Sequence, residues 1–255
     1  MIIMKTSSTV GDMVSDNIDN KQFLDSELHI SGIIQQWVLF NLVNTMVNAA
    51  DRYSLGHLLL IGYTSKDAVA SWCSTTLLAH LIADNPKPKE KLLNVISAVD
   101  QSPTGTKTLM EMSIDLLKNP SSSFNSRIVV LIYLSTWLLH FALAVQQFVL
   151  IPSTISYFIS QIRNPSSEND REAPMSSLHA FVLELMCFFP SERLKQLINK
   201  EIGAGVFKEK LDMIQQSTSF INASKNRSLT FNDMTFDYAF TRLYHYSCGL
   251  IKKLF

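Results

Sequence analysis

The sequence predicts an all-α protein of about ten helices, each roughly ten to twenty residues long and joined to the next by a short loop. Apolar residues recur at helical spacing along most of the chain, and prolines, asparagines and serines separate the periodic segments. Alternation of apolar and polar residues is essentially absent, as is an Asn-Gly hairpin turn. This pattern is typical of an α-solenoid or an irregular α-bundle, and periodicity alone does not separate the two.

The N-terminal segment differs from the rest of the chain. Residues 1–20 are rich in Ser, Thr, Asp and Asn and have no periodic apolar positions, so we predict a disordered segment over residues 1–24. One helical domain is expected over residues 25–255, and it begins with one or two helices over residues 28–50.

Capping residues and prolines mark the helices that follow. Ser65 is expected to cap a helix over residues 66–84, which the Asn-Pro-Lys-Pro segment 85–88 ends. A helix over residues 89–99 leads into a turn over residues 102–105.

The middle of the chain contains the most apolar helices. A helix over residues 106–118 places four apolar side chains on one face. Ser126 is expected to cap a long apolar run that divides into two helices near residues 138–141, and a further helix is expected over residues 153–163. The four side chains on the face of the first of these helices are Leu109, Met112, Leu116 and Leu117.

A polar, charged loop over residues 164–174 separates the last third of the chain. Apolar residues then repeat at helical spacing from Leu178 to Phe189, where Pro190 ends the helix. The last elements are a helix capped by Ser191 and ended by Gly203, an amphipathic helix over residues 206–216, a loop over residues 225–233, and a helix from about Asp237.

The distribution of charge argues against a nucleic-acid binder but allows either a protein of buried helices or a membrane protein. Lys plus Arg and Asp plus Glu both number 22, so the net charge is zero and the basic surface of a nucleic-acid binder is not predicted. Residues 28–50 and 128–161 contain no Asp, Glu, Lys or Arg, and the second run is long enough to span a bilayer. Both runs carry Ser, Asn, Gln or His, which favours buried helices, and a multi-spanning membrane protein is the alternative.

No catalytic motif is found, and we predict no catalytic, cofactor-binding or metal-binding residue and no enzyme activity. The six histidines lack metal-ligand spacing, and His80 and His140 are interpreted as core or helix-packing residues. A thiol–imidazole pair of His245 and Cys248 is the alternative that would make the chain an enzyme.

Other reactive or aromatic side chains have structural interpretations. The three cysteines are expected to be reduced thiols, and the three tryptophans are expected to be core anchors. Lysines and glutamates between residues 192 and 210 predict a solvated face with helical ion pairs. The cysteines are Cys73, Cys187 and Cys248, and the tryptophans are Trp37, Trp72 and Trp137.

Four segments in consistent order resemble one protein family over residues 65–255. The segments are Trp72 with Leu78-Ala79-His80, Lys89-Glu90, Leu92-Leu93 and Val95; Leu134-Ser135-Thr136-Trp137-Leu138 with Ala144-Val145 and Phe148; ERLKQLINKEIGAGVFKEKLDMI over residues 192–214; and Phe236-Asp237, Phe240-Thr241 and Leu243. This pattern resembles the head region of the Uso-type vesicle-tethering proteins, the general vesicular transport factors.

The resemblance implies an armadillo-like α-solenoid head, which is the fold class that we predict. It also implies a role in tethering transport vesicles to Golgi membranes, through binding of Rab-family GTPases, golgins and SNARE proteins, by a peripheral protein that forms dimers. The resemblance assigns no individual binding residue. We expect this chain to lack most of the N-terminal armadillo repeats and the coiled coil and acidic tail that follow the head in this family.

Overall fold

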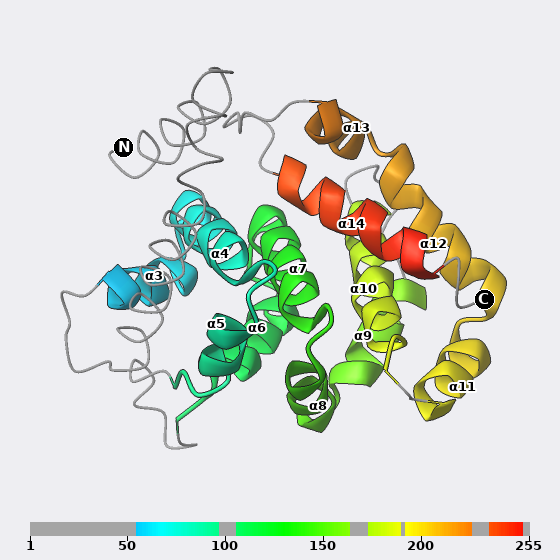
Figure 1. The fold of residues 1–255 in the computed structure, drawn as a ribbon, viewed down its shortest axis with the longest axis horizontal. Helices are drawn as coiled ribbons and strands as arrows, with labels where there is room; N and C mark the ends of the chain where they lie inside the picture. Colours follow the sequence, from blue (N-terminus) through cyan, green and yellow to red (C-terminus); the bar gives the residue numbers. More distant parts are fainter. Residues whose placement is uncertain (1–54, 97–105, 164–172, 190–191, 226–234, 252–255) are drawn as a thin grey trace, which may run out of the picture.

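The computed structural model describes residues 55–96, 106–163, 173–189, 192–225 and 235–251 (Figure 1). The predictions for residues 1–24 and 28–50, including Trp37, lie outside these ranges. The described part contains twelve helices: α3 (Leu55–Tyr63), α4 (Ala68–Ile82), α5 (Pro86–Leu92), α6 (Leu109–Lys118), α7 (Phe124–Leu138), α8 (Ala142–Leu150), α9 (Thr154–Arg163), α10 (Ala173–Met186), α11 (Glu192–Glu201), α12 (Ala204–Gln216), α13 (Thr218–Lys225) and α14 (Tyr238–Ile251).

The all-α, solenoid-type fold is confirmed. Every third helix from α4 to α10 packs beside the next, so α4, α7 and α10 form one continuous row, with α3 on one end and α12 on the other (Figure 1). The helices between them cover this row: α6 and α8 contact α7, and α9 contacts α10. Stacking of successive helical units in this way is how an α-solenoid builds its core.

Helix α7 is the centre of the core. Twelve of its fifteen residues are buried, which explains why the sequence there has no charged residue after Arg127. Two of its buried hydroxyls donate to carbonyls one turn earlier, Ser135 to Leu131 at 2.8 Å and Thr136 to Ile132 at 3.0 Å. These two hydroxyls are therefore satisfied inside the helix, whereas the buried Tyr133 hydroxyl has no hydrogen-bond partner among the residues described.

Two helix starts differ from the prediction because a neighbouring residue provides the cap. The Asp67 carboxylate, and not Ser65, accepts the backbone N–H of Val69 at 2.8 Å at the start of α4. Ser123, and not Ser126, caps α7, since its hydroxyl accepts the Ser126 N–H at 3.1 Å. Where several capping residue types lie within four positions, the sequence pattern does not select among them.

The prolines at residues 85–88 begin a helix and do not only end one. Helix α4 stops at Ile82, and α5 begins at Pro86, where the missing N–H of proline costs nothing because the first turn leaves its donors unbonded. The predicted helix over residues 89–99 therefore starts three residues too late and ends too late, because α5 ends at Leu92.

The remaining helix predictions are confirmed in outline. The apolar run divides between Leu138 and Ala142, and Gly203 ends α11 with a φ of 87° while it also precedes α12. Helix α13 was not predicted; the Ser217 hydroxyl accepts its Phe220 N–H at 3.3 Å, and the Phe220 ring is buried. The predicted loops fall largely in residues 164–172 and 226–234, outside the described ranges.

The helices are short relative to the thickness of a bilayer. Among the helices described, none has both the length and the apolar character to cross a membrane alone. Helices α8 and α9 reach that length and composition only as a pair, and they meet at a bend of 87°.

The indole of Trp137 links α7 to α5. Its Nε1–H donates to the Lys89 carbonyl at 3.0 Å in a fully buried position. In a regular α-helix this carbonyl would accept the N–H of Leu93, which instead donates to Glu90 at 3.1 Å. The indole therefore replaces a backbone hydrogen bond that α5 does not form.

We expect the Trp137→Phe variant to lose about 1–3 kcal/mol more free energy of unfolding than Trp72→Phe, because it leaves a buried carbonyl without a donor. Trp72 is the matched control, since it is also buried but shows no indole hydrogen bond within the described ranges. Urea-induced unfolding measures the difference, and equal losses in the two variants would contradict this role for the indole.

Candidate functional site

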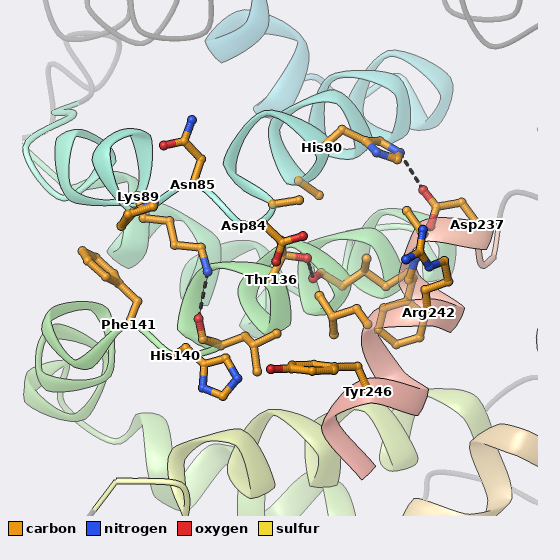
Figure 2. A pocket seen from close by; sticks show the side chains of 18 residues that line it. His80, Asp84, Asn85, Lys89, Thr136, His140, Phe141, Asp237, Arg242 and Tyr246 are labelled. Atoms are coloured by element: carbon orange, nitrogen blue, oxygen red, sulfur yellow. Dashed lines mark hydrogen bonds and ion pairs between the residues drawn. The ribbon is translucent and has the colours of Figure 1, made fainter. Parts of the chain in front are cut away.

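A pocket of about 580 Å³ lies where the end of α4, the start of α5, the α7–α8 turn and one face of α14 meet (Figure 2). Its two sides are far apart in the sequence, since His80 and Asp237 are separated by 157 residues. The apolar part of the lining includes Ile132, Leu139, Phe240 and Leu243, and the polar part is His80, Asp84, Asn85, Lys89, Thr136, His140, Asp237, Arg242 and Tyr246.

Lys89 is a buried cation on the α5 side of the pocket. Its residue is 6% exposed, and its Nζ donates to the Leu139 carbonyl at 2.8 Å, at the C-terminal end of α7 (Figure 2). A positive charge is stabilised there by the negative end of the helix dipole. Burial lowers the pKa of Lys89 to about 8, against the opposing effect of the nearby Asp84 charge.

An ion pair closes the opposite end of the pocket. His80 Nε2 lies 2.8 Å from the Asp237 carboxylate, whose other oxygen accepts the Phe240 N–H at 2.7 Å and caps α14 (Figure 2). The hydrogen bond to Asp237 raises the pKa of His80, and partial burial acts in the opposite direction. Asp237 thus connects α4 to α14, and it also caps the N-terminus of α14.

Two residues at the pocket have unusual backbone conformations. Asp84 and His140 have φ values of 53° and 55°, and only one other non-glycine residue of the described ranges, Ser153, has a positive φ. Asp84 lies between α4 and α5, and His140 lies between α7 and α8. Such conformations cost free energy and are concentrated at functional sites.

The α14 side presents an arginine and a tyrosine one turn apart. Arg242 is exposed and has no carboxylate within 4.0 Å in the described part of the chain. Tyr246 is 57% exposed, and its ring meets the His140 ring edge-on with the centroids 5.9 Å apart. Both side chains extend from α14 and line the pocket (Figure 2).

His80 and His140 are interpreted from the sequence as core or helix-packing residues. They are not in the core, but both make helix-packing contacts, His80 with Asp237 at the start of α14 and His140 with Tyr246 of α14. Both are exposed at the pocket: the His80 side chain is 44% accessible, and His140 contacts the rings of Phe188 and Tyr246. The buried histidine is His179, whose pKa is lowered to about 4 by burial. Sequence reasoning did not single out His179, because several histidines lie in or beside apolar helices. The sequence pattern does not show which of them faces the core.

The structure does not bring His245 and Cys248 together as a catalytic pair. The exposed His245 ring packs on Phe220, with the centroids 5.4 Å apart, while the Cys248 side chain hydrogen-bonds Tyr244. Neither of these contacts is the nucleophile–base hydrogen bond that this chemistry needs.

The structure also locates the tryptophans, the cysteines and the charged residues that the sequence singled out. Trp72 and Trp137 are core residues, and the three cysteines form no disulfide within the described ranges. Lys195 pairs with Glu192 at 3.4 Å within α11, and Arg163 of α9 reaches Glu201 at 3.0 Å. In the ranges described, no three His, Cys, Asp or Glu side chains gather closely enough to hold a metal ion. The pocket therefore combines charge, an apolar surface and an exposed aromatic ring, which is an arrangement suited to binding.

A family model described as the Uso1 / p115 like vesicle tethering protein, head region, matches residues 20–254. The chain belongs to this family. General vesicular transport factor p115 from Homo sapiens and from Bos taurus are each 30% identical over 225 residues, and the protein of that name from Rattus norvegicus is 29% identical. These matches cover 83% of this chain and 23% of each relative, so the chain spans about a quarter of their length.

The left-handed conformation of His140 can be tested with two substitutions. His140→Gly and His140→Ala remove the same ring contacts, but only alanine keeps a Cβ in the strained conformation. We expect the alanine variant to be less stable by about 1 kcal/mol. Thermal unfolding measures the difference. As a control, Ala142→Gly at the start of α8 should reverse the order, since glycine is unfavourable in a helix.

The His80–Asp237 pair predicts a pH-dependent stability. Because the folded-state pKa of His80 is raised, its contribution is complete below about pH 6.5, the unfolded value, and is lost as the pH rises through the folded pKa. We expect wild type to exceed His80→Gln in free energy of unfolding by up to about 1 kcal/mol near pH 6, and by less near pH 8. Chemical unfolding of both proteins across this range measures it; a pH-independent difference would exclude an ionic contribution.

Proposed function

We propose that this chain is the head module of a vesicle-tethering or docking factor in transport from the endoplasmic reticulum to the Golgi and within the Golgi. The match of the tethering-protein head model to residues 20–254 is the observation that carries the proposal. Stacked helices offer extended surfaces for partner proteins, which agrees with a module that works by binding and not by catalysis.

The proposed partners are a Rab-family GTPase, golgins and SNARE proteins, bound at the cytosolic face of Golgi membranes by a peripheral protein. Several residues on which the family resemblance rests, including His80, Lys89 and Asp237, line the pocket. The zero net charge supports association with proteins more than attraction to an anionic surface. A homodimer is part of the proposal, and light scattering should then give about twice the chain mass of 28.8 kDa.

Binding to a Golgi Rab GTPase in its two nucleotide states tests the proposal. We expect the full chain to bind the GTP-loaded form at least about tenfold more tightly than the GDP-loaded form, because the switch segments of GTPases are ordered by the γ-phosphate. Titration of each form against the immobilised chain measures the two affinities, and the GDP form is the matched control. Equal affinities, or no binding to either form, would contradict a role as a Rab effector.

A further inference from the structure

We propose that the pocket between α4, α5, α7 and α14 binds an acidic segment of a partner protein that also inserts an apolar side chain. Arg242 is the counter-charge for the acid, and Tyr246 is the aromatic edge of the site. The inference deepens the proposed function, because it assumes that the chain acts by binding proteins, and it names a site and a chemical class for one such partner.

The charges of the lining determine the sign of the ligand. Of the two carboxylates, Asp237 bonds His80 and the start of α14. Asp84 has no cation within 4.0 Å among the residues described, and its charge acts on the buried Lys89 only at longer range. Arg242 is the cation left over, because it has no carboxylate within 4.0 Å among the residues described. A planar guanidinium at a pocket mouth suits a carboxylate, which it binds through paired hydrogen bonds.

The apolar part of the lining determines which kind of side chain the partner presents beside its acidic residue. Ile132, Leu139, Phe240 and Leu243 supply apolar surface, and about 580 Å³ falls within the range of pockets that hold ligands. One leucine-sized or phenylalanine-sized side chain would bury its apolar area there, and this burial favours binding. The combination favours a peptide segment over a lone anion, which would leave this surface uncovered.

The rim is built for contact with a protein. Arginine and tyrosine are enriched among the residues that dominate interface energies, and Arg242 and Tyr246 stand one turn apart on α14 (Figure 2). Tyr246 rests edge-on against His140, whose backbone is held in a left-handed conformation. A rim fixed before binding loses less conformational entropy when the partner arrives.

Selection from a random peptide library displayed on phage, against the immobilised full chain, provides the test. We expect the enriched peptides to share an Asp or Glu beside an apolar residue. Fluorescence anisotropy of the labelled peptides should show that Arg242→Glu weakens binding at least about tenfold, whereas Arg193→Glu changes it less than about twofold. Arg193 is the matched control: it is exposed on α11, lies outside the pocket and also has no carboxylate within 4.0 Å in the described ranges.

A charge exchange makes the test specific. A peptide with its acid replaced by lysine should bind Arg242→Glu more tightly than it binds wild type, provided that both proteins unfold at similar temperatures. The assignment is overturned if no peptide is enriched, if the enriched peptides lack an acid, or if they bind Arg242→Glu as they bind wild type. Displacement of the peptides by inorganic phosphate, but not by chloride at equal ionic strength, would instead indicate an anion site and would also overturn it.

The peptide-binding test and the Rab-binding test can fail independently of each other. Rab binding that depends on nucleotide, together with failed peptide selection, removes the pocket assignment alone. Acidic peptides that require Arg242, together with Rab binding that ignores nucleotide, remove the Rab proposal and leave a peptide site.

Discussion

Burial of α7 on nearly every side is the constraint on which the other elements depend. A helix with twelve of fifteen residues buried must be apolar all round, and the polar groups at its two ends must find partners. Ser123 provides the partner at the first turn, and the Lys89 ammonium provides it at the last. Helix α4 covers one flank of α7 and α10 the other, so the continuous row of helices follows from this single element.

The helical class and the division of the long apolar run follow from periodicity and composition, which report burial directly. The positions of the caps do not, because Asp67 and Ser123 compete with nearby hydroxyl residues of equal local preference. The pocket was beyond sequence reasoning for a different reason: Lys89 sits in the polar segment KPKEK, which looks solvated until the end of α7 lies against it. Only the tertiary arrangement makes that lysine buried.

The pocket also connects parts of the solenoid that do not pack through the central row. Helix α14 follows the last of the stacked helices in the chain, yet the Asp237 carboxylate at its start bonds His80 of α4 (Figure 2). It is anchored on α10 as well, where the Tyr244 ring lies 4.5 Å from the ring of Phe181. A ligand that fills the pocket would therefore contact α4, α5 and α14 together, and its binding energy would hold these helices together.

The sequence separation of the His80–Asp237 contact has a consequence during synthesis. Ribosomes add about 5–20 residues per second, so the 157 residues between the two partners require roughly 8–30 s of elongation. Helices α4 and α7 can pack against each other in that interval, but the apolar wall that Phe240 and Leu243 share with them has not yet been made. For that time the nascent chain presents an incomplete apolar surface, and cotranslational chaperones are the factors suited to shield it.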